Sequence, residues 1–330
     1  MNKLTIYILL FVTHLCYILP ATLLAQDTAR IAFFTSSNSP DKQRMLLAGS
    51  TLAGTYAAFT IGLNKVWYSN YPKSAFHLFN DVGEWRQIDK YGHLYSAYFQ
   101  SDAGYQMARW TGMNEGNSTL VGLGMGMLFQ TTIEVLDGFS SQWGFSMWDM
   151  GFNVLGTAAF VTQQHYWKRQ RLRIKFSTFP YPYNKLNYSV GNPPVTLNER
   201  ASQLYGNSFA ARIFKDYNAN TFWLSINIHD FTGPMQGLPP WLNIAVGIGA
   251  NNLYGGYSNE WTQNGISYSI PGDLFPRYNQ YFLGLDIDWS KIKTDYAFLN
   301  ALFKLFNFFK LPTPAVELTS LGQWKWHLIY

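Results

Sequence analysis

The chain has 330 residues, which is long enough for two modest domains or one large one. Charged residues make up only 13% of the chain, about half the usual share, whereas aromatic residues reach 18%. The formal net charge is +5, and no group of lysines and arginines is dense enough to indicate nucleic-acid binding. So few charges cannot easily keep a whole protein surface hydrated, and tryptophan and tyrosine favour membrane interfaces. The composition therefore favours a protein that places part of its surface against lipid.

Residues 1–25 have the organisation of an export signal. Lys3 supplies the positive start, an apolar stretch follows, and small residues offer a cleavage point after Ala25. Cys16 is the only cysteine, and the residues before it lack the pattern of a lipoprotein signal. Cleavage would remove this cysteine and so exclude disulfides and thiolate chemistry from the mature protein. We therefore expect export to the periplasm or the outer membrane, with residues 26–44 as a linker.

Residues 45–168 are expected to form an N-terminal four-helix bundle. Its first segment carries no charge and is rich in small residues, which suits either a bilayer span or close helix packing. Asn117 and Ser118 are candidate caps for the third helix, and Ser146 with Asp149 resembles a capping box at the start of the fourth. The predicted helices cover residues 45–63, 87–109, 117–135 and 146–167.

Residues 169–330 change from a helical period to strict alternation of apolar and polar residues. This pattern predicts strands with one apolar face at residues 172–177, 222–229, 242–249, 281–289 and 323–330. The fold class is therefore α+β, with an antiparallel β region after the helices. In an exported protein, strands with aromatic ends favour a membrane-associated barrel or half-barrel of the outer-membrane type. The alternative is a soluble antiparallel sheet that buries its apolar faces on a core.

Residues 299–311 interrupt the alternation. Their phenylalanines and leucines, with Lys304 and Lys310, predict an amphipathic helix at a membrane interface.

Ionisable and amide side chains occur at helical spacing on three otherwise apolar segments. Residues three or four apart on a helix share a face, and bundle-core sites are built from such faces. Acids, lysines and histidines are rarely buried unless they are paired or used. We therefore expect these side chains to converge in the interior of the bundle. They are Asp89, Lys90 and His93 on the second helix, Glu134 and Asp137 on the third, and Asp149 and Asn153 on the fourth.

Two interpretations of this set concern a structural role and a catalytic role. The first is a structural polar network that includes Asn153 and Gln130 and holds the helices together. The second is a catalytic site in which His93 acts as the base and Asp89 orients it. In that site Lys90 would receive an anionic group such as a phosphate.

A metal site is the third interpretation. Glu134, Asp137 and Asp149 could supply carboxylate oxygens to a divalent cation, with His93 as a further ligand. The sequence contains no familiar enzymatic motif, such as a nucleophile elbow, a phosphate-binding loop or a zinc-protease motif. It therefore specifies no cofactor.

Ordered motifs continue through the helical region. They are Phe79-Asn80-Asp81, Glu84-Trp85, Asp89-Lys90, Gly92-His93, Phe129-Gln130-Thr131, Ile133-Glu134, Asp137-Gly138-Phe139-Ser140, Trp143-Gly144-Phe145-Ser146, Asp149, Asn153 and Gly156. In this order they resemble the YfiM-like family of predicted periplasmic proteins, whose function is not established, over about residues 45–168. The layout is also distantly similar to VanZ-like membrane proteins. The first resemblance implies an envelope location and a helical domain with an ordered polar set, and it implies no activity.

The expected function is that of an exported envelope protein, associated with the outer membrane, with a structural or assembly role. Its partners would be membrane lipid and cell-envelope components, and not nucleic acid. The alternative is a metal-assisted hydrolase that acts on a phosphate-bearing or glycan envelope substrate.

Overall fold

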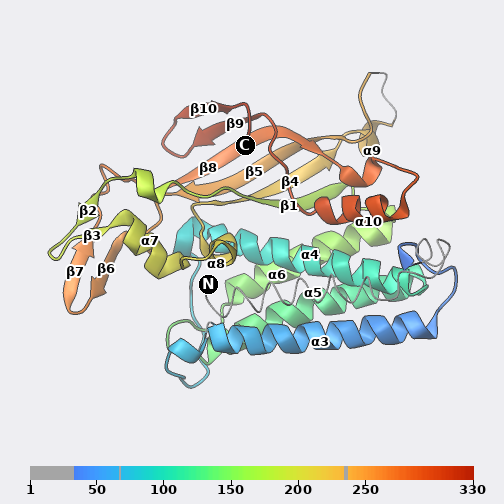
Figure 1. Cartoon of the computed structure of the whole chain (residues 1–330), viewed down its shortest axis with the longest axis horizontal. Coiled ribbons are helices and arrows are strands. Elements are labelled where there is room, and N and C mark those ends of the chain that lie inside the picture. The colour runs from blue at the N-terminus through green and yellow to red at the C-terminus, as the bar shows by residue number, and fades with distance from the viewer. Residues whose placement is uncertain (1–32, 67, 234–236) are drawn as a thin grey trace.

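The computed structural model describes residues 33–66, 68–233 and 237–330, so the predicted signal peptide and residues 26–32 of the predicted linker lie outside it. Four long helices come first in the described chain, and a six-stranded antiparallel sheet follows (Figure 1). This order confirms the α+β class. The helices are α3 (Lys42–Val66), α4 (Ile88–Trp110), α5 (Glu115–Gly138) and α6 (Met147–Trp167), with the 3-10 turns η1 (Tyr68–Asn70) and η2 (Glu84–Gln87) between α3 and α4.

Side-chain caps set the starts of α5 and α6. The Ser146 hydroxyl accepts a hydrogen bond from the backbone N–H of Asp149 at 3.0 Å, which confirms one half of the predicted capping box. In place of Asp149, Glu134 accepts the hydrogen bond from the Ser146 backbone N–H. α5 begins after Asn114, whose side chain accepts from the backbone N–H of Asn117 at 2.9 Å. The predicted cap at Asn117 and Ser118 is therefore wrong by about a turn, because Asn114 already supplies the acceptor and Glu115 a favourable first-turn charge.

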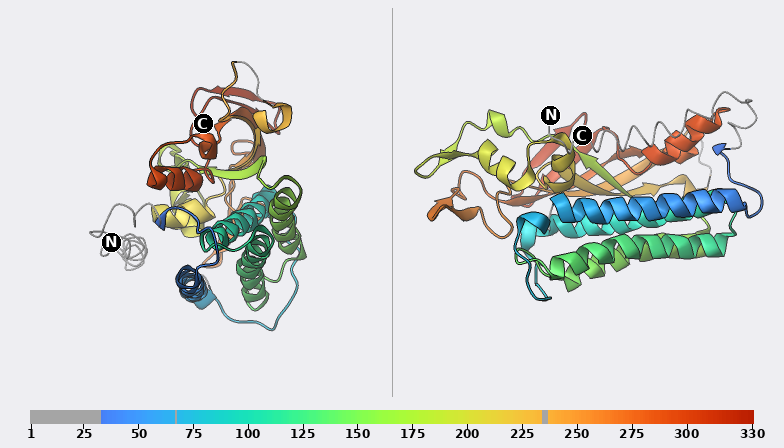
Figure 2. Two further views of the ribbon diagram at one scale, coloured as in Figure 1. Left: turned by 90° about the vertical axis from the view of Figure 1, so that its right-hand side faces the viewer. Right: turned by 60° about the horizontal axis from the view of Figure 1, so that its bottom comes forward.

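Close packing joins the helices to one another. A Cβ on Gly122 of α5 would lie 2.6 Å from the backbone oxygen of Ser101 on α4, so only glycine fits at this crossing. α3 packs on the far side of α5, where the rings of Tyr56 and Phe59 lie 5.4 and 5.0 Å from the ring of Phe129. In Figures 1 and 2 the helices run side by side, with α4 next to the sheet and α3 farther from it.

Two of these helices have strongly apolar, exposed surfaces. By length and composition alone, Lys42–Lys65 and Glu115–Gly138 are the described segments that could cross a bilayer. Leu46 on α3 is 75% exposed and Leu120 on α5 is 65% exposed. The helical half therefore presents apolar side chains outwards.

The main sheet has the strand order β1-β4-β5-β8-β9-β10, and all of its pairs are antiparallel. In the described residues β1 and β10 lie at opposite edges and do not pair, so the sheet is open. Of the predicted barrel or half-barrel, the closed form is therefore not present. Six strands are fewer than the eight of the smallest common barrels. The strands are β1 (Leu172–Thr178), β4 (Asn220–Asn227), β5 (Leu242–Asn251), β8 (Tyr278–Ile287), β9 (Ala315–Thr319) and β10 (Trp324–His327).

A short segment also covers the outer edge of β1. The backbone N–H of Phe176 donates to the backbone oxygen of Phe308 at 3.2 Å, and the backbone N–H of Lys310 donates to the backbone oxygen of Phe176 at 2.9 Å. This segment follows α10 (Ala297–Phe306), the helix that the sequence predicts at residues 299–311. The edge that would have to pair with β10 to close a barrel is thus already in use.

The two faces of the sheet are inverted relative to a sheet in water. On the apolar face Val246 and Leu283 are direct cross-strand partners, and they are 43% and 56% exposed. On the polar face Lys175, Ser225 and Asp286 are at most 1% exposed. The alternation that the sequence predicts is therefore present, with the polar side turned inwards.

The helices cover only part of the apolar face. Phe176 and Phe222, on β1 and β4, pack against Ile88 and Tyr95 of α4. Farther across the sheet the same face stays open at the large apolar side chains Leu224, Ile244, Val246, Tyr281, Leu283 and Leu285.

The C-terminal end of the chain covers part of the polar face. The ring of Tyr330 stacks on Phe282 at 4.2 Å, and the Lys310 ammonium lies 4.3 Å from the centre of the Trp223 ring.

Parts of the chain between residues 183 and 270 form a tyrosine-rich lobe beside the main sheet (Figure 1). Its buried core includes Tyr183, Tyr205 and Tyr254. The sequence does not predict this lobe or strand β9, because their short strands carry too few alternating residues. The elements not yet named are η3 (Tyr183–Lys185), β2 (Ser189–Val190), β3 (Val195–Thr196), α7 (Leu197–Tyr205), α8 (Phe209–Lys215), α9 (His229–Thr232), β6 (Glu260–Gln263), β7 (Ile266–Ser269) and η4 (Trp289–Lys291). Of these, α9 lies at the end of the sheet away from the lobe (Figure 1).

Candidate functional site

A buried lysine lies at the centre of the helical half. Lys90, in the first turn of α4, is 1% exposed. Its Nζ lies 2.7 Å from Asp149 Oδ1, 2.8 Å from Asp81 Oδ2 and 3.1 Å from Asp89 Oδ2. An ammonium group has three N–H donors, and here each of them faces one carboxylate. Lys90 therefore connects α4, α6 and the loop before η2.

Ser146, the N-cap of α6, connects this lysine to α5. Its hydroxyl donates to Asp81 Oδ1 at 2.6 Å, and its backbone N–H donates to Glu134 Oε2 at 3.2 Å. A helix N-terminus favours such negatively charged acceptors. One cap residue thus serves two carboxylates.

His93 lies between two carboxylates on the other side of the group. Its Nδ1 is 3.2 Å from Asn153 Oδ1 and 3.5 Å from Glu134 Oε1. Its Nε2 is 3.8 Å from Asp149 Oδ2. The helical polar cluster, as we call it below, comprises Asp81, Asp89, Lys90, His93, Glu134, Ser146, Asp149 and Asn153.

Acids outnumber bases in this cluster. Four carboxylates share one lysine and one histidine, and Asp81, Glu134 and Asp149 are each at most 6% exposed. Buried carboxylates need either a compensating cation or a proton. The excess of acid is therefore the chemical property that any function of the cluster must explain.

The pKa values of the acids reflect this excess. Burial raises the pKa of Glu134 to about 8 and that of Asp149 to about 7. Burial also raises the pKa of Asp89. It would lower the pKa of His93, but the charges of Asp149, Glu134 and Asp89 outweigh it and raise that pKa. The group therefore holds its protons more tightly than separate side chains would.

The structure brings together most of the residues that the sequence analysis singled out. Six of them belong to the cluster, namely Asp89, Lys90, His93, Glu134, Asp149 and Asn153. Asp137 lies apart and accepts a hydrogen bond from the Tyr68 hydroxyl at 2.9 Å. Gln130 is buried but donates to the side chain of Gln100 at 3.0 Å. Lys90, the predicted anion-binding residue, has carboxylate partners on three sides.

Asp81 is the one acidic residue of the cluster to which the sequence assigns no role. It lies in a loop before η2, so no helical spacing links it to Lys90. Its only signal was membership of the Phe79-Asn80-Asp81 motif. Although burial opposes ionisation, hydrogen bonds from Asp149, Lys90 and Ser146 lower its pKa.

Two groups within the cluster have a donor spacing that suits a metal ion. One is His93 with Glu134 and Asp149, and the other is Asp81 with Asp89 and Asp149. In each group one donor atom from every residue lies within 4.8 Å of the others. Asp137, a predicted ligand, belongs to neither group.

A second polar network occupies the inner face of the sheet. Lys175 is fully buried, and its Nζ lies 2.7 Å from Asp286 Oδ2. The same ammonium donates to the Ile287 oxygen at 2.8 Å and to Asn307 Oδ1 at 3.0 Å. Ser225 donates to Asp286 Oδ2 at 2.6 Å. The predicted alternation identifies these residues as one face but not as partners.

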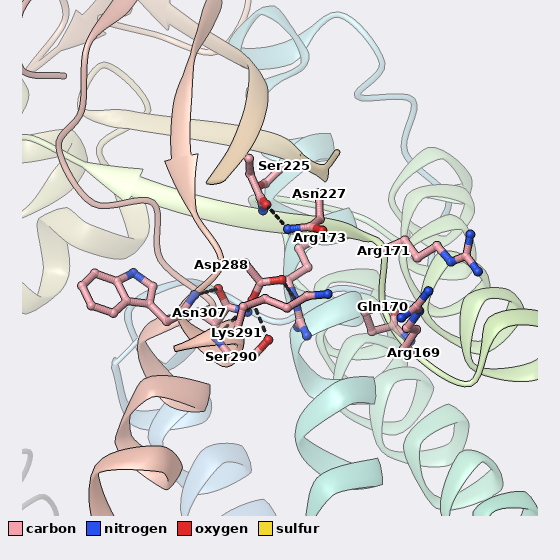
Figure 3. Close-up of polar contacts among 12 residues, drawn as sticks. Arg169, Gln170, Arg171, Arg173, Ser225, Asn227, Asp288, Ser290, Lys291 and Asn307 are labelled. Carbon is pink, nitrogen blue, oxygen red and sulfur yellow. Dashed lines mark hydrogen bonds and ion pairs between the residues drawn. The ribbon is translucent and has the colours of Figure 1, made fainter. Parts of the chain in front are cut away.

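This network continues to the end of β8 (Figure 3). Asp288 accepts hydrogen bonds from the Ser290 hydroxyl at 2.5 Å and from the Asn307 side chain at 2.8 Å. Arg173 lies 3.9 Å from Asp288 and 3.5 Å from Asp102 of α4. The contact of Arg173 with both acids ties the sheet to the helices.

Comparison with known proteins concerns the helical half. Residues 78–164 match the model of a family described as predicted periplasmic lipoprotein (DUF2279). No curated protein and no solved structure matches the chain. The description agrees with the expected export to the cell envelope. It also includes lipid attachment, which the sequence around Cys16 does not predict and which lies outside the described residues. The matched stretch contains every residue of the helical polar cluster and so links this cluster to an uncharacterised family of predicted periplasmic proteins.

Proposed function

We propose that this protein is an exported envelope protein that binds a membrane with its apolar outer surface and has a structural or assembly role there. The observation that carries the proposal is the inverted sheet. Val246 and Leu283 face outwards, whereas Lys175 and Asp286 are buried on the other face. A sheet with one face in water normally buries its apolar side, whereas a sheet against lipid turns that side outwards.

The same arrangement occurs in the helices. On α5, Glu134 is 1% exposed, while Leu120 and Leu128 are 65% and 44% exposed. Contiguous apolar patches on a protein surface mark sites of interaction with membranes or other proteins. Both halves of the chain therefore support lipid as the main partner, with other envelope components as further partners.

The helical polar cluster would hold the architecture together. In an apolar medium no water is available, so polar groups must satisfy one another inside the protein. Lys90 and Ser146 do this by joining α4, α5, α6 and the loop that carries Asp81. This contact pattern supports a structural role.

The hydrolase alternative has less support. It assigns Lys90 to an anionic substrate group, yet the Lys90 ammonium is 1% exposed and already faces three carboxylates. His93, with Asp149 and Glu134 nearby, has the composition of an acid–base group. A hydrolytic role would need a substrate path to this imidazole.

Vesicle flotation tests membrane binding through the sheet. We would combine Val246→Glu with Leu283→Lys, which places opposite charges on two cross-strand partners of the outer face. The protein would be mixed with vesicles of phosphatidylethanolamine and phosphatidylglycerol and centrifuged through a density gradient. We expect wild type to float with the vesicles and the double variant to stay largely at the bottom.

A matched control places the same charges away from the proposed surface. Thr262→Glu with Ser267→Lys also creates an opposite cross-strand pair, on the small β6–β7 hairpin. This control should float like wild type. Flotation of the Val246/Leu283 variant to the same extent as wild type would contradict membrane binding through the sheet.

A further inference from the structure

We propose that the helical polar cluster binds one divalent transition-metal ion, of the Zn²⁺ or Mn²⁺ class, between His93, Glu134 and Asp149. The site goes beyond the structural role proposed above and does not depend on membrane binding. Its three donors come from α4, α5 and α6, so one ion would connect three helices.

The spacing of the donors suits an ion better than direct hydrogen bonds. His93 Nδ1 lies 3.5 Å from Glu134 Oε1, and His93 Nε2 lies 3.8 Å from Asp149 Oδ2. Both distances exceed the usual donor–acceptor distance of an N–H···O hydrogen bond, which is about 2.7–3.2 Å. Two ligands on a tetrahedral ion, each bound at about 2.1 Å, lie roughly 3.4 Å apart. These two distances reach different ring nitrogens, of which one ion would take only one. One donor atom from each of the three residues nevertheless lies within 4.8 Å of the other two, so rotation of the side chains would let them share an ion.

Glu134 supplies the second observation. Its side chain is 1% exposed, and its Oε1 is buried without a hydrogen-bond partner. A buried polar atom without a partner is costly, and a buried carboxylate is especially so. This oxygen lies on the side of Glu134 that faces His93. A cation there would satisfy it and offset part of the excess negative charge.

The other group of donors is already filled. Asp81, Asp89 and Asp149 surround the Lys90 ammonium at 2.8, 3.1 and 2.7 Å. A metal ion there would have to displace a lysine that is paired on three sides. Lys90 thus occupies one half of the acidic cluster, and the half around His93 is the one that a metal ion can enter.

The donor types determine the class of ion. One imidazole and two carboxylates suit zinc, manganese or iron, whereas calcium and magnesium favour sites made of oxygen ligands only. One ring nitrogen of His93 would bind the ion. The other would donate its N–H to the oxygen that faces it, and Asn153 Oδ1 is such a partner at 3.2 Å from Nδ1.

The test is metal binding by the purified full-length protein. The protein would be stripped with a chelator and titrated with Zn²⁺ and with Mn²⁺ by calorimetry, and its metal content would be measured after desalting. We expect one ion per chain. Glu134→Gln should weaken binding at least about tenfold, the scale on which even outer-shell changes act. The matched control is Asp137→Asn, one turn away on α5, which should bind as wild type does because Tyr68 already engages Asp137.

Glu134→Gln is the preferred variant because it replaces a buried carboxyl group, one oxygen of which has no hydrogen-bond partner, by a neutral amide of nearly the same shape. It should leave the stripped protein folded, as circular dichroism would check. If it fails to fold, pulsed electron paramagnetic resonance of Mn²⁺ bound to wild type decides. Coupling to an imidazole nitrogen would support the site. Absence of that coupling, failure of wild type to retain either ion, or equal affinity in Glu134→Gln would each overturn it.

Discussion

Replacing Lys90 by methionine removes the one ammonium that joins α4, α6 and the Asp81 loop. Methionine matches the length of the lysine stem but leaves Asp81, Asp89 and Asp149 without their cation. Burial lowers the pKa of Lys90, but the nearby carboxylates outweigh it and raise that pKa, so wild type carries the charge at neutral pH. The substitution therefore changes the charge of a buried site and hardly changes its volume.

The magnitude follows from the distances. At an effective dielectric constant of about 20, unit charges separated by about 3 Å attract one another by roughly 5 kcal/mol. Desolvation of the ammonium offsets much of this gain in wild type. Removing one partner of a buried ion pair costs about 3–5 kcal/mol, because the remaining charge stays buried without compensation. We expect this loss for Lys90→Met, which is a large part of the roughly 5–15 kcal/mol that stabilises a typical domain.

Urea unfolding in a mild detergent, followed by circular dichroism at pH 7, measures this loss. Adding Asp89→Asn to Lys90→Met should restore part of the stability. Lys90 pairs with Asp89 Oδ2 in wild type, so the second change removes one carboxylate that the first change leaves without its cation. Lys168→Met is the matched control. Its partner Glu115 lies 3.7 Å away in a pair that is 62% and 39% exposed, so the change should cost at most about 0.5 kcal/mol.

The unfolding experiment can also refute the reasoning. If Lys90→Met were as stable as Lys168→Met, the carboxylates around Lys90 could not lie in a dry, mutually compensated interior. The structural role of the helical polar cluster would then fail.

Three further predictions concern other parts of the molecule. Burial raises the pKa of Asp137 to about 7. The folded protein therefore keeps a proton on Asp137 that the unfolded chain loses above about pH 4. The stability that this protonated carboxyl group contributes is lost as pH rises from 4 to 7. Asp137→Asn should therefore add roughly 2 kcal/mol at pH 8 and little at pH 4 in urea unfolding; an equal effect at both pH values would contradict this. Gly122→Ala should cost about 1–3 kcal/mol of stability because its Cβ would meet the backbone oxygen of Ser101. Gly124→Ala, with open space around it, should be neutral or stabilising. Equal melting temperatures of the two variants would count against the close crossing of α4 and α5. Lys175→Met should lower the free energy of unfolding by about 3–5 kcal/mol in the same assay, and adding Asp286→Asn should recover part of this loss. A loss of stability below about 1 kcal/mol for Lys175→Met would show that the inner face of the sheet is hydrated.

Helical periodicity was enough to predict the four long helices and most of the helical polar cluster. Asp89 and His93 are four residues apart and face the same interior, as do Asp149 and Asn153. Spacing on a helix fixes the face to which a side chain belongs, so helices that pack on one another bring such faces together. This explains why residues from α4 and α6 were found together without knowledge of the fold.

Partner choice within the cluster could not be predicted. Glu134 and Asp137 lie on nearly the same side of α5, yet one faces His93 and the other faces Tyr68. The path of the loops between helices decides this, and loops carry no periodic signal. The same limit applies to Asp81, which reaches Lys90 from a loop. The sequence signal for such residues is their place in an ordered motif and not their spacing.

The direction of the sheet faces was also beyond the sequence. Alternation assigns Lys175 and Asp286 to one face and Val246 and Leu283 to the other, but either face could be the inner one. What decides the direction is whether the polar side chains can satisfy one another. Lys175 and Ser225 lie 2.7 and 2.6 Å from Asp286 Oδ2, and Lys175 also donates to the Ile287 oxygen at 2.8 Å, which removes much of the cost of burying them.

The exposed side of the sheet then carries an energetic consequence. Fully burying a large apolar side chain is worth roughly 1.5–3 kcal/mol, so six such side chains left about half exposed forgo roughly 5–10 kcal/mol in water. That loss is comparable with the whole stability of a typical domain. The six are Leu224, Ile244, Val246, Tyr281, Leu283 and Leu285, and they are joined by exposed leucines on α3 and α5. A chain with 13% charged residues has few polar groups with which to shield such a surface. Contact with lipid would recover this energy without any change in the fold, and it is the reason why we place the proposed membrane contact on the sheet as well as on the helices.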